Sequence, residues 1–335
     1  MAASRNPTNV TVTVPARLHL GFFDLHGGLG RRFGSIGVAI SDPQTRIAIE
    51  RASTTEITGA ESDRVARYLA TMQRDLGIAG GHRVDILDAV PAHAGLGSGT
   101  QLALAVAAAV RRLHDLPLDV AGDAIRLDRG ARSGAGVGLF HHGGLVVDGG
   151  RGPALRPAPV IARMPVPDNW RILVILDPSR QGKHGEEEFA AFEQLPPFPA
   201  DLAAQLCRLL VMQALPGLAE QDLAGFGAAI TDIQQRLGDY YAPAQGSSRF
   251  MSPDVAAVLD ALARAGATGI GQSSWGPTAF AFAPSHAEAE RMAAVARAHP
   301  SGRALDIRIC VGLNRGAEIH AVIPGRAEGA NPESR

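Results

Sequence analysis

Cysteine and lysine are both scarce in this chain of 335 residues. The two cysteines, Cys207 and Cys310, show no metal-ligand spacing, which argues against a zinc or iron–sulfur motif. Two cysteines also exclude a disulfide-rich scaffold, and we expect both thiols to be buried and reduced. Lys183 is the only lysine, so arginine carries nearly all of the positive charge.

Strong net charge and long apolar runs are also missing. Thirty-two basic and 33 acidic residues give a formal net charge of −1, which argues against a general nucleic-acid binder. No apolar run reaches the length of a membrane span, and the first residues lack the apolar core of a signal peptide. A hydrophobic content of 46% is typical of a globular protein. We therefore expect a cytoplasmic enzyme that binds neither nucleic acid nor membrane.

The hydrophobic pattern predicts an α+β protein in two parts. Residues 62–76 carry the apolar stripe of an amphipathic helix, whereas residues 8–20 alternate like a strand. Further strands are predicted at 36–40, 44–50, 82–90, 145–148, 170–176, 278–283 and 304–311. Further helices are predicted at 101–114, 119–128, 201–215, 218–237, 253–265 and 285–299, with a glycine-dense loop at 130–144. Proline and glycine cluster at 149–159, so the predicted domains are 1–155 and 156–325, followed by a disordered tail at 326–335.

The segment from Pro91 to Thr100, PAHAGLGSGT, lies between a predicted strand and a predicted helix. This order gathers backbone N–H groups at a helix N-terminus, where phosphate binds well. It lacks the lysine of a Walker loop and the spacing of a dinucleotide motif. An ordinary strand-to-helix turn, with Ser98 as its N-cap, remains the alternative. The candidate phosphate ligands here are Gly95, Leu96, Gly97, Ser98 and Gly99.

Pro91-x-x-x-Gly-Leu-Gly-Ser98 resembles the phosphate-binding motif of the GHMP kinase superfamily, in which a second serine stands where this chain has Gly99. Gly269-x-Gly-x-x-x-x-Gly276 is similar to the third motif of that superfamily. The resemblance implies a two-domain GHMP-kinase-like fold. Its N-terminal domain would contain a left-handed βαβ crossover, and its C-terminal domain would be a ferredoxin-like α/β sandwich.

The middle loop argues against kinase activity. Many GHMP kinases carry Ser-Gly-x-Asp here, with the aspartate as catalytic base, but this chain reads Ser133-Gly-Ala-Gly136. A glycine cannot orient or deprotonate an acceptor hydroxyl. Some superfamily kinases function without this aspartate, so an ATP-dependent small-molecule kinase remains the alternative. A non-catalytic ligand-binding descendant of the fold is a third hypothesis.

Longer motifs resemble the β-ribofuranosylaminobenzene 5′-phosphate synthase family. They are ARLHLGFFDLHGGLGRRFGSIG at 16–37, SGAGVGLFHHGG at 133–144, the Gly182-x-x-Gly-x-x-Glu188 loop and GQSSWGP at 271–277. The resemblance implies a pentosyltransferase that joins phosphoribosyl pyrophosphate to a para-substituted benzoate in tetrahydromethanopterin biosynthesis. Carbon dioxide and pyrophosphate leave. It also implies a homodimer.

This reaction needs anion-binding groups, a carboxylate near the ribose C1 and a binding pocket for the benzoate ring. The catalytic candidates are Arg17, His19 and Asp24. Candidate phosphate ligands outside the glycine loop are Arg31, Arg32 and Lys183. Candidate substrate contacts are Ser133, Gln272, Ser273, Ser274 and Trp275. The expected cofactor is Mg²⁺, with Ser98 and Glu188 as its candidate ligands.

Several of these residues also have ordinary structural explanations. Arg17 could form a surface ion pair, and His19 could be a satisfied core histidine. Asp24 could close an Asx turn, and Trp275 could pack in the core behind a glycine turn. The acidic run that ends at Glu188 could be a solvated first helical turn. The sequence leaves open whether the ring carries an amino or a hydroxyl group, and which phosphate end occupies the glycine loop.

Overall fold

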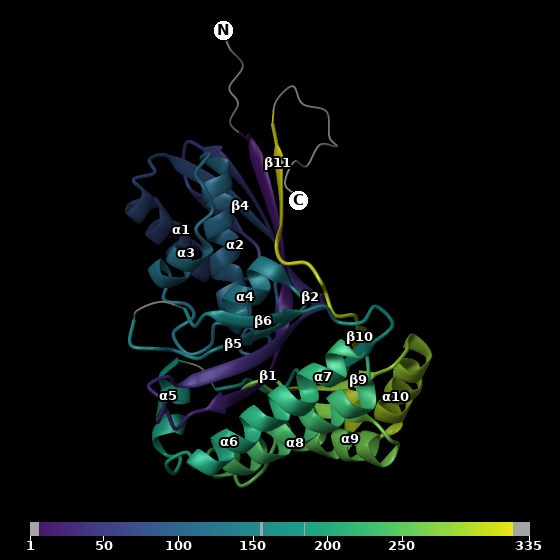
Figure 1. The fold of residues 1–335 in the computed structure, drawn as a ribbon. Coiled ribbons are helices and arrows are strands. Elements are labelled where there is room, and N and C mark those ends of the chain that lie inside the picture. The colour runs from purple at the N-terminus through teal and green to yellow at the C-terminus, as the bar shows by residue number, and fades with distance from the viewer. Residues whose placement is uncertain (1–6, 155–156, 184, 324–335) are drawn as a thin grey trace.

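The computed structural model describes residues 7–154, 157–183 and 185–323, so the predicted tail at 326–335 lies outside the described residues. Two sheets with helices packed against them make up the described chain, as the α+β prediction expected (Figure 1). The long strands β1 (Asn9–Asp24) and β2 (Phe33–Ala52) form an antiparallel hairpin. β2 is one continuous strand, although the pattern predicted two short ones.

Seven strands form the first sheet within the described part of the chain. β11, β1, β2, β4 and β3 lie in that order, while β5 pairs with β2 and β6 pairs with β5. β3 runs parallel to β4, and the other pairs are antiparallel. The remaining bounds are β3 (Glu56–Thr58), β4 (Gly81–Asp88), β5 (Leu145–Asp148), β6 (Val160–Met164) and β11 (Glu318–Val322).

Helices α1 (Ser62–Leu76), α2 (Ser98–Leu113), α3 (Val120–Arg126) and α4 (Ala135–His142) belong to the same half of the molecule. α2 is buried along almost its whole length, since small alanine side chains let it pack closely. α4 corrects the predicted loop at 130–144. A Cβ on Gly138 would stand 2.6 Å from a methyl of Val160 and 2.9 Å from one of Val146. Close packing therefore accounts for a glycine that would otherwise weaken this helix.

The second sheet has the order β10, β7, β9, β8, all antiparallel, among the described strands. In chain order this is 4-1-3-2, the order of the expected ferredoxin-like sandwich. Its strands are β7 (Arg171–Leu176), β8 (Thr268–Gln272), β9 (Thr278–Ala283) and β10 (Asp306–Cys310). The helices are α5 (Gly185–Glu193), α6 (Ala200–Leu209), α7 (Leu215–Ala219), α8 (Leu223–Tyr241), α9 (Pro253–Arg264) and α10 (His286–Ala298).

The two halves are not separated at residue 155. β6 and β11 follow the predicted boundary in sequence, yet both pair within the first sheet. Figure 1 shows β11 running beside β1. One hydrophobic core also joins the halves, with Leu18 and Ile36 of the first sheet in the same cluster as Phe226 and Phe282. The loops where the halves meet are thereby fixed relative to one another.

Residues Ala200–Ala219 run from α6 through a π-helical turn to α7. By length and composition alone this helical run could cross a membrane, with a mean hydropathy of 1.4 and a third of it buried. Leu206 and Leu210 on one face pack into two of the hydrophobic clusters. Cys207 is exposed on this run, which corrects the expectation that both cysteines are buried, whereas Cys310 is buried in β10.

Candidate active site

Two glycine loops that lie far apart in sequence pack against each other. A Cβ on Gly95 would overlap the carbonyl oxygen of Ser273, and a Cβ on Gly276 would overlap the backbone at Ala94. The hydroxyl of buried Ser273 donates to the Gly95 carbonyl oxygen at 2.7 Å and accepts from the backbone N–H of His19 at 2.9 Å. The motifs of the two halves therefore form a single site.

The glycine loop ends at the N-terminus of α2. Gly95 and Gly97 have φ angles of +83° and +75°, values that glycine adopts without strain. Gly97, and not Ser98, is the N-cap, and no side chain of the described residues caps this helix. Ser98 is the first helical residue instead. The positive end of the helix dipole is therefore left to an incoming anion.

A cleft of about 440 Å³ opens beside this helix end. Of the described residues that line it, five are arginines, one is Lys183 and one is a carboxylate, Glu188. The arginines are Arg17, Arg64, Arg67, Arg129 and Arg132. So many cations facing one carboxylate create a positive potential that attracts phosphate or carboxylate groups.

Arg17 is the central cation of this cleft. Its stem crosses the glycine loop, because a Cβ on Gly97 would lie 2.5 Å from Cγ and 2.9 Å from Nε of Arg17. Its Nε and Nη1 atoms are buried and have no hydrogen-bond partner in the described chain. Burial lowers the Arg17 pKa to about 10, with nearby Arg132 adding to the shift and Glu188 opposing it. Arg17 is thus a charged donor at neutral pH with two unused donor nitrogens.

Arg64 and Arg129 flank the helix end, and sequence reasoning missed both. A Cβ on Gly99 would lie 2.8 Å from Nη2 of Arg64 and 3.4 Å from Nη1 of Arg129. Arg64 is oriented by an ion pair with Glu61 at 2.7 Å, and Arg129 lies over the Tyr68 ring at 5.5 Å. No sequence signal marks them, since an arginine on the polar face of a helix, like Arg64, or in a loop, like Arg129, usually faces solvent. Sequence reasoning also missed Arg67 on α1 and the loop residues His93 and Arg132.

Lys183, just before α5, and Glu188, on α5, both line the cleft. Lys183 pairs with Glu187 at 3.2 Å, and Glu188 pairs with Arg132 at 2.8 Å. No group of three His, Cys, Asp or Glu side chains in the described ranges could hold a metal ion, so a resident Mg²⁺ site made only of protein does not fit. Mg²⁺ more often binds through one or two carboxylates plus substrate phosphates. Ser98 and Glu188, which line the same cleft, fit that arrangement.

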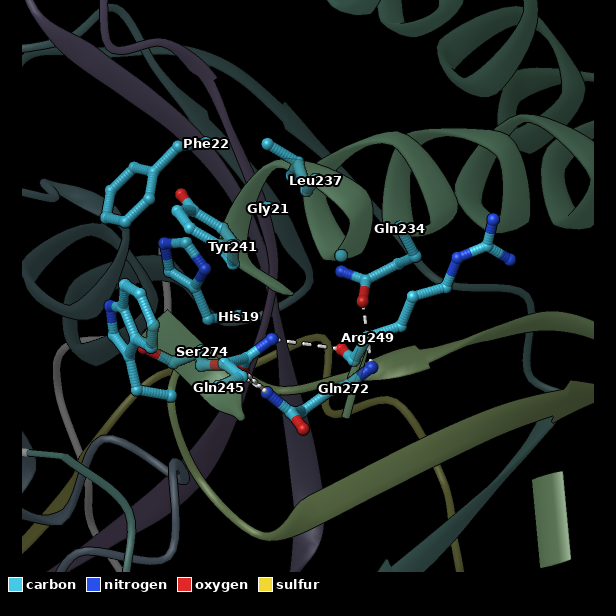
Figure 2. Close-up of a pocket in the computed structure, with 12 residues that line it drawn as sticks. His19, Gly21, Phe22, Gln234, Leu237, Tyr241, Gln245, Arg249, Gln272 and Ser274 are labelled. Carbon is cyan, nitrogen blue, oxygen red and sulfur yellow. Dashed lines mark hydrogen bonds between the residues drawn. The ribbon is translucent and has the colours of Figure 1, made fainter. Parts of the chain in front are cut away.

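A second cavity of about 30 Å³ adjoins the cleft (Figure 2). Ser274 and Trp275 line both spaces, and His19 and Tyr241 line the small one. Trp275 is buried and packs against Phe192 at 5.3 Å and Tyr241 at 4.7 Å, so it is both a core residue and a wall of each space. The other described lining residues are Gly21, Phe22, Gln234, Leu237, Gly238, Gln245, Arg249 and Gln272.

Two polar atoms in this small cavity are buried and lack a hydrogen-bond partner among the described residues. They are Nε2 of His19 and the hydroxyl of Tyr241. Burial, with Arg17 and Arg132 nearby, holds the pKa of His19 well below its usual range, so its imidazole is neutral. Burial also raises the pKa of Tyr241, so its phenol stays protonated. Unsatisfied buried polar atoms of this kind are rare in proteins and indicate a ligand or an ordered water.

Four other candidates lie away from both cavities. Asp24 accepts from the Gly27 N–H at 2.8 Å and so closes a turn at the hairpin tip. Arg31 donates to the carbonyl oxygens of Gly149 and Gly150, both at 2.7 Å, and Arg32 donates to that of Leu25 at 3.2 Å. Ser133 shares a buried network with Ser35 and Asp148, whose carboxylate accepts from backbone N–H groups at the start of α4. In the structure these four residues make contacts within the fold and do not line the cleft.

Family models and solved structures of known proteins agree with this architecture. The family model for the GHMP kinases N terminal domain matches residues 63–144, and the model for GHMP kinases C terminal matches residues 214–302. A homoserine kinase from Cytophaga hutchinsonii has a TM-score of 0.64 at 19% identity, covering 93% of this chain and 98% of that one. A mevalonate diphosphate decarboxylase from Enterococcus faecalis has a TM-score of 0.66 at 13% identity, covering 94% and 99%. The expected GHMP-kinase-like fold is confirmed.

Relatives of higher sequence identity indicate which family within the GHMP kinase superfamily this chain belongs to. Beta-ribofuranosylphenol 5′-phosphate synthase of Archaeoglobus fulgidus is 34% identical over 285 residues, which cover 82% of this chain and 87% of that protein. The protein of the same name from Methanothermobacter thermautotrophicus is 29% identical over 328 residues, covering 91% and 97%. The chain therefore belongs to the beta-ribofuranosylphenol 5′-phosphate synthase family, and it is an enzyme built on the GHMP kinase fold.

Proposed function

We propose that this enzyme joins the ribose 5-phosphate group of phosphoribosyl pyrophosphate to a para-substituted benzoate, with loss of pyrophosphate and carbon dioxide. The observation that carries the proposal is the arginine-lined cleft, in which the buried guanidinium of Arg17 lies over the glycine loop with two donor nitrogens unused. A substrate with two phosphate ends and a second substrate with a carboxylate would supply the missing acceptors.

Each part of the cleft has a role in this reaction. The helix end with Arg64 and Arg129 binds one phosphate end of the ribosyl donor, and Arg132 and Lys183 lie where they can bind the other. Positive charge develops at the ribose C1 as pyrophosphate departs, and Glu188 is the carboxylate of the described cleft that can stabilise it. Arg17 holds the acceptor carboxylate, which fixes the ring carbon that attacks C1.

We further propose that Mg²⁺ enters this cleft together with the phosphates of the substrate. Ser98 and Glu188 would hold it, since both line the cleft and provide oxygen ligands. When bound, the ion neutralises charge on the departing pyrophosphate. The finer expectations of a cytoplasmic homodimer acting in tetrahydromethanopterin biosynthesis rest on the family resemblance alone. Light scattering on the purified protein tests the dimer.

The direct test is incubation of the purified protein with Mg²⁺, phosphoribosyl pyrophosphate and a carboxyl-labelled benzoate. We expect labelled carbon dioxide, with either 4-hydroxybenzoate or 4-aminobenzoate as acceptor. Release that is no faster than in the protein-free control would contradict the proposal. Consumption of ATP that depends on an alcohol would favour the kinase alternative, and tight ligand binding without turnover would favour the non-catalytic one.

A further inference from the structure

The cavity between β1, the end of α8 and the loop at 273–276 contains polar atoms that the proposed reaction has not yet used. We propose that this cavity binds the para substituent of the acceptor ring and that His19 Nε2 accepts the para-hydroxyl proton during ring attack. This inference rests on the proposed function and adds to it a second binding subsite and a proton acceptor.

The size of the cavity limits what can enter it. About 30 Å³ is more than the roughly 10–15 Å³ that a single water molecule requires. It therefore accommodates a hydroxyl or amino group and not a whole ring. Because Trp275 and Ser274 line both this cavity and the cationic cleft, a ring placed along Trp275 would extend from one space into the other.

The spacing on β1 agrees with such a ring. Arg17 and His19 are two residues apart on a strand, a separation of about 7 Å. This is comparable to the span from the carboxylate of a benzoate to its para oxygen. Arg17 faces the cleft and His19 faces the cavity, so the two side chains are placed to contact opposite ends of one acceptor.

The two orphaned polar atoms are suited to a phenol. A phenol oxygen can donate its proton to Nε2 of His19 and accept a hydrogen bond from the hydroxyl of Tyr241. An aromatic amine can donate to both groups, but its nitrogen is a poor acceptor. The cavity therefore favours a hydroxyl over an amino group, and Tyr241 is the residue that distinguishes them.

The electrons and the proton balance in this scheme. As the phenol proton moves to Nε2 of His19, the ring carbon that bears the carboxylate forms a bond with the ribose C1. The C1–O bond to pyrophosphate breaks, and its electron pair leaves on pyrophosphate. Carbon dioxide then departs, its bonding pair restores the aromatic ring, and His19 returns the proton to the para oxygen.

The surroundings keep Nε2 of His19 free of a proton, so this atom can act as an acceptor. Arg17 on its own strand, Arg132 from the loop before α4 and Arg249 on the cavity wall are the cations near the imidazole, and Tyr241 faces it from α8. Burial, with Arg17 and Arg132 adding to it, disfavours a second proton on the free imidazole, so His19 is neutral before substrate binds. Acceptance at Nε2 requires the tautomer with its proton on Nδ1.

The test compares His19→Gln and Tyr241→Phe in the full-length enzyme with phosphoribosyl pyrophosphate and Mg²⁺. His286→Gln and Tyr240→Phe are the matched controls, since the His286 side chain is exposed on α10 and the Tyr240 hydroxyl donates to the Pro196 carbonyl oxygen outside the cavity. We expect His19→Gln to lower kcat with 4-hydroxybenzoate about 100-fold or more, in the range of lost acid–base catalysis. The loss with 4-aminobenzoate should be less than about 10-fold, since the amine can attack without losing a proton. Tyr241→Phe should raise KM for 4-hydroxybenzoate more than that for 4-aminobenzoate, because only the phenol oxygen can accept the proton of the Tyr241 hydroxyl.

A binding measurement separates this inference from the proposed function. Without phosphoribosyl pyrophosphate no turnover occurs, and the ultraviolet absorption of bound 4-hydroxybenzoate should shift to longer wavelength, because its hydroxyl donates a hydrogen bond to the neutral imidazole of His19. The shift should be smaller in His19→Gln and unchanged in His286→Gln. Equal losses on both acceptors with an unchanged bound spectrum would overturn the inference and leave the function intact. Failure of the wild-type enzyme to release carbon dioxide from either acceptor would overturn the function, whatever the spectrum shows.

Discussion

Gly136 faces the guanidinium of Arg17: a Cβ built on Gly136 stands 3.7 Å from Arg17 Nε and 3.2 Å from a methyl of Thr100. At this position the GHMP kinase motif has its aspartate. A carboxylate here would lie beside Arg17 and pair with it. Glycine leaves that guanidinium available for the substrate. The absence of the aspartate at position 136 therefore removes the kinase base and also leaves Arg17 free to bind an anion.

The first prediction concerns this pair. Gly136→Asp should lower kcat/KM about 100-fold or more, because an internal carboxylate would compete for Arg17 with the acceptor carboxylate. Gly136→Ala is the control. It has no charge, Gly136 lies within α4, and the 3.2 Å contact with Thr100 requires only a small shift. Carbon dioxide release measures both variants, and an active Gly136→Asp enzyme would contradict the assigned role of Arg17.

Arg64 and Arg129 should determine affinity for the ribosyl donor. We expect Arg64→Gln and Arg129→Gln each to raise KM for phosphoribosyl pyrophosphate about 10-fold, the loss of one charge-assisted hydrogen bond, with little change in the acceptor KM. Arg126→Gln is the matched control, since Arg126 pairs with Asp119 and Asp123 outside the cleft. Titration with pyrophosphate gives a second measurement. An unchanged donor KM in both variants would remove these residues from the phosphate site.

Ser273 should be needed for activity as well as stability. Ser273→Ala leaves the Gly95 carbonyl oxygen and the His19 N–H without their partner in a buried place, at a cost of about 1–3 kcal/mol in the free energy of unfolding. Ser285→Ala removes the cap of α10 at a cost of about 1 kcal/mol. Thermal unfolding should show both losses, but only Ser273→Ala should change the steady-state constants. Equal activity in the two variants would show that the contact between the loops serves stability alone.

Stability should fall in mild acid because of a histidine pair outside the active site. Nε2 of His82 and Nε2 of His114 lie 2.8 Å apart, so one proton is shared between them. Burial and the nearby Arg51 lower the pKa of His82, and burial, Arg51 and His82 lower that of His114 to about 4. The unfolded chain therefore binds more protons than the folded one between about pH 6.5 and pH 4, and Tm should fall as pH falls through that window.

His114→Gln tests this prediction against the acid sensitivity of the whole protein. The variant should show a shallower fall of Tm between about pH 6.5 and pH 4, because the suppressed protonation of His114 is gone. His286→Gln, with an exposed imidazole, should follow the wild-type curve. Parallel curves for His114→Gln and the wild-type protein would place the acid sensitivity elsewhere.

Removal of Mg²⁺ should affect turnover and not folding. Chelation should abolish carbon dioxide release while leaving Tm unchanged, since the described cleft lacks a full set of protein ligands. Glu188→Gln should raise the Mg²⁺ concentration needed for half-maximal activity, measured at saturating substrate. Asp201→Asn at the exposed start of α6 is the control. Full activity in chelator would exclude Mg²⁺ from the reaction.

The elements with a clean hydrophobic period were predictable from sequence. Residues 62–76 form a helix with the predicted bounds, and residues 278–283 form a strand with the predicted bounds. α4 was missed because Gly136 and Gly138 lower helix propensity, and only the packing around them explains the helix. β6 and β11 were missed because β-propensity depends on the partner strand, which sequence does not name.

Some residues of the candidate site were likewise predictable from sequence, and others were not. The glycine loop and the loop at 273–276 were identifiable because each has a backbone requirement that only certain residues satisfy. Arg64 and Arg129 were not, since their role depends on how α1 and the loop after α3 lie against the α2 N-terminus. Asp24, by contrast, was predicted as a catalytic residue and has a structural contact. It belongs to a family-like motif, yet its carboxylate closes the hairpin turn at Gly27.

The pairing of β1 with β11 has a consequence for how the protein is made. β1 leaves the ribosome long before residues Glu318–Val322, which cover its edge. Until they emerge, one edge of β1 is open to pairing with other chains. Ser273 likewise emerges long after Gly95, whose loop it holds in place. Synthesis that stops early therefore yields a chain with a complete glycine loop, an unprotected strand edge and no assembled active site.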